Sequence, residues 1–473
     1  MSTMDPLTVS ADNPRYLTPL SGAQRAVYLT GSHIWNNFHD GMGPAGTAPK
    51  DLDYGAYLDF LAARGHNFIR LWRWEHFRSQ AAGGAFELNM TPQPWRRDDS
   101  GRFDLSRFDP AYFRRLRERV EAAGDRGMYV AVMLFDGWAL HLSPALDNVE
   151  GHPFHAANNI NGVGITSILD HQVLPLDPAV QALQEDYLRQ VVDTVHDLPN
   201  VLYEVANESS GGGAADAEMA AVLGVPSGTD WGDSTGWQYW VIEFVKDYER
   251  QQGYQPRPVG MTMQFPVPDQ AKVNAPLFDG PADWISPGFD DDLFRDGAPV
   301  SRWWLDPPAA DGRKVLITDS DHVAPGHAEP VWVWKAFLRG HNPILMDYGL
   351  IDGTDPAGDP SPGAPPFAAF EPARHAMGDT RRYAETIDLI SMMPRGDLTS
   401  TGYALADPGA EYLILHPGGG TFTATVASGT YAVGWHDITS RSTSTGERLT
   451  VANDEPTTFT TTGPAVLHLK RLT

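Results

Sequence analysis

The sequence predicts an α/β protein, a (β/α)8 TIM barrel followed by a small all-β sandwich. Over residues 1–398, apolar runs of strand length alternate with amphipathic stretches of helix length, which is the pattern of a parallel barrel. From residue 399 the chain changes to short alternating runs rich in Thr, Val and Gly, which are typical of a sandwich. The length of 473 residues accommodates both domains, because a single α/β barrel commonly takes about 250 residues or more.

Apolar runs bounded by Gly, Pro, Asn or Ser predict the eight barrel strands. They span residues 30–37, 67–75, 128–135, 200–207, 259–265, 284–288, 314–322 and 343–349. Apolar residues at helical spacing predict the covering helices between them. These helices are expected at residues 53–64, 109–125, 177–197, 237–250, 331–339 and 370–389.

Three further segments lie outside this repeat. Residues 1–25 are expected to form an N-terminal hairpin that leads into the barrel. Residues 139–174 form a long loop, which in a compact domain is more often a functional lid than an accident, although a structured cover with no chemical role is the alternative. The domain at residues 399–473 is expected to pack on the barrel as a scaffold. Its strands are expected at residues 411–415, 421–426, 431–435, 448–451, 457–461 and 465–469.

Composition excludes several classes of function. Hydrophobic residues make up 42% of the chain and charged residues 20%, as in ordinary globular proteins. The formal charge of −25 would repel a phosphate backbone or an anionic lipid surface, so neither nucleic acid nor membrane is an expected partner. The chain has no cysteine, which excludes disulfides and thiolate metal sites. Residues 1–6 lack the start of a secretory signal, so we expect a cytoplasmic protein, with a secreted protein whose signal has been removed as the alternative.

Carboxylates follow two of the predicted strands. Glu208 comes directly after the strand at residues 200–207, and Asp319 and Asp321 end the strand at residues 314–322. The C-terminal rim of such a barrel presents reacting groups to a substrate. Glu208 alone could equally cap the next segment. Two acids at the ends of two strands are what glycosidic cleavage requires, since one protonates the leaving oxygen and the other attacks or activates water.

The pair Asn207-Glu208 and the Val-Leu-Ile-Thr run before Asp319 resemble the clan A glycoside hydrolases, particularly family 5 and the apiosidase-like group. The resemblance implies that Glu208 is the acid/base and that Asp319, where most of the clan has Glu, is the nucleophile. Asp321 is the rival nucleophile. An arginine that holds the nucleophile ionised ends the second strand of the clan, and Arg70 stands at the matching place. The C-terminal domain resembles the sandwich appended to apiosidase-like hydrolases.

Further side chains at the strand ends are candidate substrate-binding residues. Asn207 is expected to hydrogen-bond the sugar hydroxyl next to the reacting carbon, and Arg70 could pair with Glu204 inside the barrel as well as contact the nucleophile. Aromatic side chains here, including Trp74, serve either as sugar platforms or as barrel packing. The complete set of substrate-binding candidates is Arg70, Asn207, His33, Trp35, Trp72, Asp136, Trp138, Asp321, His322 and Tyr348.

The sequence therefore predicts a retaining glycoside hydrolase that acts on an oligosaccharide or a polysaccharide side chain, with no cofactor and no metal. Retention requires carboxyl groups about 5 to 5.5 Å apart, and burial beside an ionised aspartate should raise the pKa of Glu208. One alternative is a carbohydrate-binding barrel without chemistry. The other is a metal-dependent hydrolase with ligands drawn from His33, His141, His152, His155, Asp319, Asp321 and His322.

Overall fold

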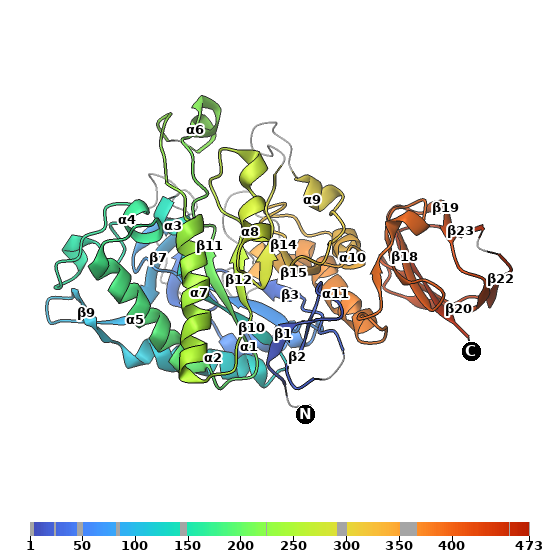
Figure 1. Ribbon diagram of the computed structural model, residues 1–473, viewed down its shortest axis with the longest axis horizontal. Helices are drawn as coiled ribbons and strands as arrows, with labels where there is room; N and C mark the ends of the chain where they lie inside the picture. The colour runs from blue at the N-terminus through green and yellow to red at the C-terminus, as the bar shows by residue number, and fades with distance from the viewer. Residues whose placement is uncertain are drawn as a thin grey trace.

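The computed structural model describes residues 4–22, 25–44, 51–81, 86–141, 149–223, 225–290, 300–350, 367–453 and 455–472. Eight parallel strands form a barrel in the order β3-β15-β14-β13-β12-β11-β10-β5, which confirms the predicted fold (Figure 1). The barrel strands are β3 (Gly31–His33), β5 (Phe68–Leu71), β10 (Tyr129–Asp136), β11 (Val201–Asn207), β12 (Val259–Thr262), β13 (Trp284–Ser286), β14 (Val315–Asp319) and β15 (Asn342–Met346).

The first and second barrel strands, β3 and β5, close the barrel. The backbone N–H of Asn67 donates to the carbonyl of Thr30 at 3.0 Å, and the Asn67 side chain accepts from the N–H of Thr30 at 2.9 Å. Gly31 is required at this seam, because a Cβ there would collide with the carbonyl oxygen of Phe68. The seam brings the residues that follow β3 and β5 to the same part of the rim.

Helices cover the outside of the barrel, and their start signals are those expected. The side chains of Asp109 and Asp177 accept from the N–H groups of Ala111 and Ala179, and a proline follows each cap. The longer helices are α1 (Tyr54–Ala62), α2 (Pro110–Gly124), α5 (Pro178–Val195), α7 (Thr235–Gln252), α10 (Pro330–Leu338) and α11 (Phe367–Ala384). Short helices are α3 (Trp138–His141), α4 (Leu169–Gln172), α6 (Ala217–Leu223), α8 (Ala275–Asp279) and α9 (Arg302–Leu305).

The N-terminal segment closes the bottom of the barrel. β1 (Leu7–Val9) pairs antiparallel with β2 (Leu17–Pro19), and a single bridge joins Leu17 to Val27. Leu7 and Leu17 pack with apolar residues from the barrel strands. This apolar plug leaves the opposite, C-terminal end of the strands for a site. The barrel residues in the cluster are Phe68, Tyr129, Ala131, Leu202, Trp284, Val315, Ile317 and Ile344.

Five short strands were not expected from the sequence. One precedes α1, and four lie between α1 and α2. They form two small antiparallel sheets, of which one joins β4, β7 and β6 and the other joins β8 and β9. Their runs are too short and too polar for periodicity to reveal them. The strands are β4 (Asp40–Pro44), β6 (Ser79–Ala81), β7 (Phe86–Thr91), β8 (Trp95–Arg97) and β9 (Phe103–Phe108).

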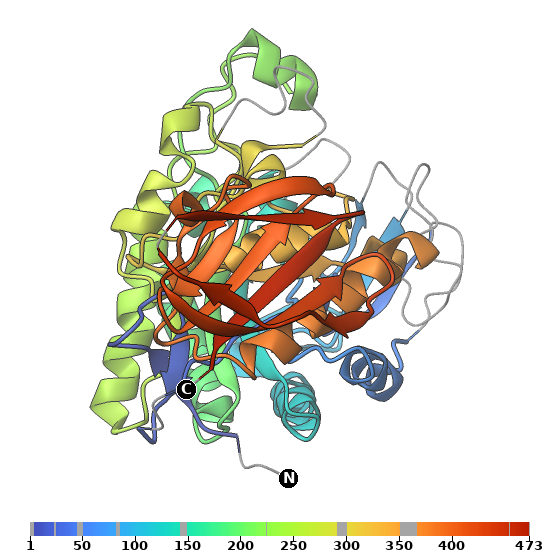
Figure 2. The ribbon, with the colours of Figure 1, turned by 90° about the vertical axis from the view of Figure 1, so that its right-hand side faces the viewer.

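Two antiparallel sheets form the C-terminal domain, which lies beside the barrel in Figure 1 and in front of it in Figure 2. All six expected strands are present. Three short strands, β16, β17 and β21, were not expected, and the sequence of β17 is rich in alanine and lacks β-branched residues. The larger sheet contains β16 (Met393–Pro394), β17 (Ala404–Asp407), β18 (Glu411–His416), β20 (Gly429–Asp437), β21 (Thr443–Thr445), β22 (Leu449–Val451) and β24 (Ala465–Arg471), and the smaller contains β19 (Gly420–Thr425) and β23 (Pro456–Thr461).

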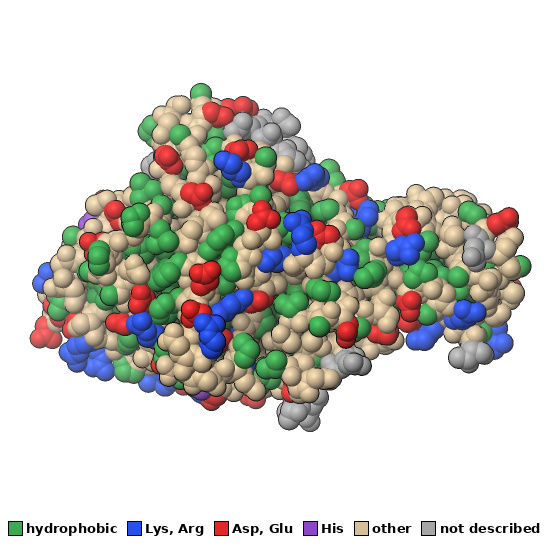
Figure 3. Space-filling model, in the orientation of Figure 1, with side chains coloured by type: hydrophobic (Ala, Val, Ile, Leu, Met, Phe, Trp, Pro, Cys, Tyr) green, Lys and Arg blue, Asp and Glu red, His purple; other side chains and the backbone are tan. Residues whose placement is uncertain are grey.

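Polar contacts hold the sandwich against the barrel helices and loops. The guanidinium of Arg441 donates to both carboxylate oxygens of Asp379 on α11, at 2.8 and 3.0 Å. The hydroxyl of Tyr403 donates to Asp306 at 2.7 Å. On the face shown in Figure 3, acidic and basic side chains are interspersed over both domains. Among the described helices, none combines the length and apolar character needed to cross a membrane.

Candidate active site

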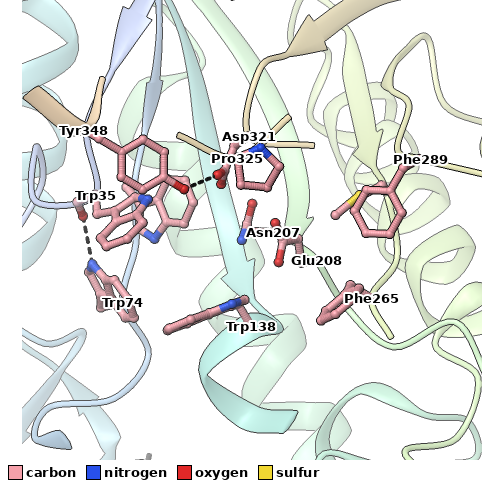
Figure 4. Close-up of a pocket in the computed structure, with 12 residues that line it drawn as sticks. Trp35, Trp74, Trp138, Asn207, Glu208, Phe265, Phe289, Asp321, Pro325 and Tyr348 are labelled. Carbon is pink, nitrogen blue, oxygen red and sulfur yellow. Dashed lines mark hydrogen bonds between the residues drawn. The ribbon is translucent and has the colours of Figure 1, made fainter. Parts of the chain in front are cut away.

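A cavity of about 290 Å³ opens at the C-terminal end of the barrel strands (Figure 4). Each of the eight barrel strands is followed by at least one lining residue, or ends in one, as expected for a site at this rim. The lining residues are Trp35, Trp72, Trp74, Trp138, Asn207, Glu208, Met263, Phe265, Phe289, Asp321, Pro325 and Tyr348.

Glu208 follows the last residue of β11 and lies in the wall of this cavity. Its backbone φ is +48°, in the left-handed region that residues other than glycine seldom adopt. Backbone strain of this kind is found preferentially at functional positions. Burial, followed by the charge of Asp321, raises the pKa of the Glu208 carboxyl well above its usual value. The protonated side chain can therefore donate a proton at a pH where an ordinary glutamate is ionised.

Asp319, the last residue of β14, lies beneath the cavity and has no exposed surface. Its Oδ2 lies 2.7 Å from Nε2 of His33 and accepts from Nη1 of Arg70 at 2.8 Å. Its Oδ1 accepts the backbone N–H of Asp321 at 3.1 Å. Burial alone would raise the pKa of this carboxyl, but His33 and Arg70 outweigh burial and lower it. Asp319 is therefore a fixed, buried negative charge.

Arg70 links three carbonyl-bearing side chains inside the barrel. Its Nε donates to Glu204 at 2.8 Å, its Nη1 donates to Asp319, and its Nη2 donates to Oδ1 of Asn207 at 2.7 Å. Both contacts expected of Arg70, with Glu204 and with Asp319, are therefore present. Because Oδ1 of Asn207 accepts from Arg70, the amide nitrogen of Asn207 is the group available at the cavity surface.

Asp321 lies in the wall of the cavity, two residues beyond Asp319, and is 9% exposed. The hydroxyl of Tyr348 donates to its Oδ1 at 2.5 Å, and Figure 4 shows both side chains at the cavity. Burial and the negative charge of Asp319 raise the pKa of the Asp321 carboxyl to about 6. This carboxylate is thus ionised near neutral pH.

His322, expected from the sequence to bind substrate, is fully buried and lies outside the cavity lining. Its Nε2 is 3.7 Å from Oε1 of Glu208, and its Nδ1 is 2.8 Å from the hydroxyl of Ser286. Burial lowers its pKa to about 3. The imidazole is therefore neutral near pH 6, where Asp321 titrates.

Aromatic side chains form one wall of the cavity. The rings of Trp35 and Trp138 stack with centroids 6.5 Å apart, and Tyr348 meets the edge of Trp35 at 5.3 Å. The indole N–H of Trp74 donates to the carbonyl of Trp35 at 2.8 Å. Such fixed rings provide the flat apolar surfaces on which sugar rings stack. Trp72 lines the cavity too, with its ring 6.0 Å from that of His33.

Five lining residues are absent from the residues assigned to the site from the sequence. They are Trp74, Met263, Phe265, Phe289 and Pro325. Each follows a barrel strand, so position was the signal available. The sequence left Trp74 as either a sugar platform or barrel packing, and the other four are apolar residues of a kind that is common in any core.

Asp136 lies elsewhere than expected for a residue that contacts substrate. It ends β10, is fully buried, and is absent from the cavity lining. Its Oδ1 accepts the backbone N–H of Trp138 at 3.1 Å. Burial, followed by the charge of Glu75, raises the pKa of the Asp136 carboxyl well above its usual value. Asp136 thus positions Trp138, which does line the cavity.

A second buried cluster surrounds Glu75. Its Oε2 lies 3.0 Å from Nε2 of His152 and 2.9 Å from Nε2 of His171, and its Oε1 accepts the backbone N–H of Asp136 at 2.8 Å. In the part of the chain that the structure describes, Glu75, His152 and His171 are the one group of three His, Cys, Asp or Glu side chains whose potential metal-ligand atoms all lie within 4.8 Å of one another.

Hydrogen bonds on the far side of each ring fix the protons of this cluster. Nδ1 of His152 accepts the backbone N–H of Phe154 at 3.0 Å, and Nδ1 of His171 accepts from the amide of Gln184 at 3.1 Å. The indole N–H of Trp237 donates to Oε1 of Gln184 at 2.9 Å and so fixes the orientation of this amide. Both rings therefore carry a proton on Nε2 and donate it to the shared carboxylate. A metal ion would have to displace both protons.

The ligands of the alternative metal-dependent hydrolase are spread over different places. His33 binds Asp319 beneath the cavity, whereas His155 caps a short helix through Nδ1, which accepts the N–H of Ala157. The side chain of His141 falls outside the described residues, as do residues 142–148 of the predicted lid loop. The described members of this set therefore do not favour a common metal centre.

Fold and cavity together define an α/β-barrel protein with two acidic strand ends at one aromatic-lined cavity and with an appended β-sandwich. No protein-family model and no curated protein sequence matches the chain. Among solved structures, the barrel and sandwich are similar to those of glycoside hydrolase family 5, so the fold is that of this clan A family.

Three of the similar structures share nearly the whole chain. One described as a glycoside hydrolase has a TM-score of 0.59 at 11% identity, covering 99% of this chain and 97% of the other. A family 5 glycoside hydrolase from Bacteroides vulgatus has a TM-score of 0.58 at 12% identity, covering 98% and 93%. Another from B. vulgatus, described as a putative glycoside hydrolase, has a TM-score of 0.58 at 11% identity, covering 100% and 83%. At these identities the similarity establishes a shared fold.

Proposed function

We propose that the protein is a retaining glycoside hydrolase, in which Glu208 is the acid/base and an aspartate at the end of β14 is the nucleophile. The observation that carries the proposal is the presence of two carboxyl side chains, Glu208 and Asp321, on one aromatic-lined cavity at the C-terminal rim, with Asp319 directly beneath. Glycosidases place such a pair on either side of the scissile bond. The sequence names Asp319 as the nucleophile, with Asp321 as its alternative.

The surroundings of Glu208 support its role as the proton donor. The raised pKa of the Glu208 carboxyl keeps this side chain protonated, while Asp319 and Asp321 carry the negative charge. In the first step Glu208 would protonate the leaving oxygen, and in the second it would take a proton from the attacking water. The amide nitrogen of Asn207, whose oxygen is held by Arg70, is placed to donate to a sugar hydroxyl.

The two sides of the cavity suggest how a glycoside would lie in it. Trp35 and Trp138 stand on one side of Glu208, and Phe265 and Phe289 stand on the other (Figure 4). The sugar that is attacked would stack on the tryptophans. The leaving group, which receives the proton of Glu208, would then meet the phenylalanines. The proposed substrate is an oligosaccharide or a polysaccharide side chain.

The test is turnover of a panel of aryl pyranosides and furanosides of both anomers by the wild-type protein and by Glu208→Gln. We expect one glycoside to be cleaved with retention of configuration. Proton NMR of the first product identifies its anomeric configuration. Loss of the proton donor should reduce kcat/KM by about 10²-fold to 10⁴-fold. Initial formation of the opposite anomer would contradict the retaining mechanism.

Glu249→Gln provides a matched control, because Glu249 is a buried carboxyl on α7 and lies outside the cavity lining. Its substitution should leave kcat/KM within about twofold of the wild-type value. If the panel and natural oligosaccharides bind without turnover, the carbohydrate-binding barrel replaces the hydrolase. Loss of activity on dialysis against a chelator, restored by a divalent metal, would favour the metal-dependent alternative.

A further inference from the structure

We propose that Asp321, and not Asp319, is the carboxylate that attacks the anomeric carbon, and that Asp319 is a positioning residue. The inference rests on the proposed function, since it assigns the nucleophile within that mechanism. It moves the nucleophile two residues beyond the position that the sequence resemblance names.

The two aspartates differ in their access to the cavity. A nucleophile must direct a lone pair at a carbon atom of the substrate in the cavity. Asp319 has no exposed surface and is absent from the cavity lining, whereas Asp321 lines the cavity. An aspartate at the strand end is one methylene shorter than the glutamate usual in the clan. The shorter side chain does not reach the cavity lining and is held by His33 and Arg70.

The two aspartates also differ in the hydrogen bonds that their carboxylate oxygens accept. Oδ2 of Asp319 is held by His33 and Arg70, and its Oδ1 accepts the backbone N–H of Asp321, so both oxygens are occupied by the protein. Asp321 accepts one side-chain hydrogen bond among the described residues, from Tyr348 to Oδ1. That bond fixes the orientation of the carboxylate and leaves Oδ2 for attack.

The charges of the two aspartates act on Glu208 to different extents. After burial, the charge of Asp321 has the largest effect on the pKa of Glu208, ahead of Arg70 and Asp136, and Asp319 has a smaller effect than any of these. Because the effect of a charge falls with distance, this order agrees with the presence of Glu208 and Asp321, but not Asp319, in the cavity lining. The acid/base and Asp321 face the same cavity, as the two-carboxylate mechanism requires.

The chemistry is balanced with Asp321 as the nucleophile. Oδ2 of Asp321 forms a bond to the anomeric carbon while the bond from that carbon to the leaving oxygen breaks, and the proton of Glu208 moves to the leaving oxygen. Water then attacks the anomeric carbon, Glu208 takes a proton from the water, and the bond to Asp321 breaks to return the carboxylate. No step requires an oxidant or another reactant.

The buried charges beneath the cavity account for the role of Asp319. Five titratable or charged groups act on Asp321 or face it across the cavity. They are Asp319, Tyr348, His33, Arg70 and Glu208. Among them, Asp319 anchors Arg70, which in turn holds the cavity residue Asn207. Oδ1 of Asp319 also accepts the backbone N–H of Asp321 itself. It therefore positions groups that touch substrate without touching substrate itself.

Chemical rescue tests the assignment directly. The glycoside that the wild type cleaves is prepared with a 2,4-dinitrophenyl leaving group and given to Asp321→Gly and Asp319→Gly with and without sodium azide. Azide can occupy the space of a missing nucleophile. We expect it to raise turnover by Asp321→Gly at least about tenfold and to yield a glycosyl azide of inverted configuration, with no rescue of Asp319→Gly. Rescue of Asp319→Gly in place of Asp321→Gly would overturn the assignment.

A second measurement uses the wild-type protein and so does not depend on the folding of a variant. A 2-deoxy-2-fluoro glycosyl fluoride of the same sugar is used to trap the covalent intermediate, and fragmentation of the labelled peptide locates the sugar. A label on Asp321 supports the assignment, and a label on Asp319 overturns it. If the wild-type protein cleaves no glycoside at all, the proposed function fails, which is a different result from a label on the wrong aspartate.

Discussion

Glu75 and Asp319 are both fully buried carboxylates that receive hydrogen bonds from imidazole rings. Glu75 is held by two histidines and has the guanidinium of Arg73 at 3.7 Å, and Asp319 is held by His33 and Arg70. In each case these partners outweigh the effect of burial and lower the pKa of the carboxyl. The two clusters are thus built from the same kinds of group in the same kind of environment.

The two clusters differ in where their hydrogen bonds lead. The bonds around Glu75 lead mainly to groups inside the protein, and they reach the cavity only indirectly, through Asp136, whose side chain holds the backbone N–H of Trp138. Those around Asp319 continue through Arg70 to Asn207 and through the backbone to Asp321, and both of these residues line the cavity. Of the two buried clusters, the one around Asp319 therefore bonds directly to polar residues of the cavity. The following variants test this distinction.

Arg70→Met should have the largest effect. It leaves Glu204 and Asp319 without their shared guanidinium, and breaking a buried ion pair from one side typically costs about 3 to 5 kcal/mol of stability. Turnover should also fall, because Asn207 loses the bond that orients it. Urea unfolding and kcat/KM of the folded fraction measure the two effects. The matched variant Arg73→Met should reduce stability with little change in kcat/KM, and an equal loss of turnover would remove the distinction between the clusters.

Glu75→Gln should reduce stability by about 1 to 3 kcal/mol at pH 7, because buried donors lose their charged acceptor. The pKa of Glu75 is lowered in the folded protein, so its contribution to stability is present above the unfolded value of about 4.3 and is lost as the pH falls. The difference between variant and wild type should therefore shrink in acid. Unfolding measured from about pH 5 down to about pH 2.5 checks this, because the contribution is lost only below the unfolded value. A constant difference across that range would show that the carboxylate charge is not responsible.

Asp319→Asn should shift the acid limb of the kcat/KM profile while turnover persists. The charge of Asp319 raises the pKa of Asp321, so its removal should lower that pKa below about 6. The acid limb then moves to lower pH, by on the order of one pH unit. A pH profile with an aryl glycoside measures the shift. Complete loss of turnover in a well-folded Asp319→Asn protein, with no acid limb left to measure, would instead identify Asp319 as the nucleophile.

Tyr348→Phe should have the smallest effect and the opposite sign. The hydroxyl bond lowers the pKa of Asp321, so its loss should raise that pKa above about 6 and move the acid limb to higher pH. A hydrogen bond contributes about 1 kcal/mol, which corresponds to a shift of somewhat less than one pH unit. The same pH profile measures it. A shift in the acid direction would show that another group controls this limb.

The sequence was sufficient to predict the barrel, the sandwich and the strand ends that carry the acids, because strand periodicity and Gly/Pro boundaries are local signals. Glu208 and Asn207 lie at the rim for this reason. The depth of each side chain could not be predicted. Whether Asp136 or Asp319 reaches the cavity depends on the loops that follow the strands, and these are fixed by tertiary contacts.

The apolar wall could not be predicted either. Met263, Phe265 and Phe289 pack against one another after β12 and β13, and in a sequence they look like ordinary core residues. Arg70 was easier, because a guanidinium inside a barrel must find carboxylates, and both expected partners were found. Composition thus identifies which polar groups must pair, whereas the walls of a cavity follow from loop conformation.

The left-handed backbone at Glu208 implies a trade-off between folding and activity. A residue with a Cβ in this conformation costs roughly 1 to 2 kcal/mol, and the buried carboxyl adds repulsion toward Asp321. Glycine would relieve both. The residue that the proposed chemistry most depends on therefore works against the native state, and a selection for thermal tolerance alone should enrich inactive variants at this position.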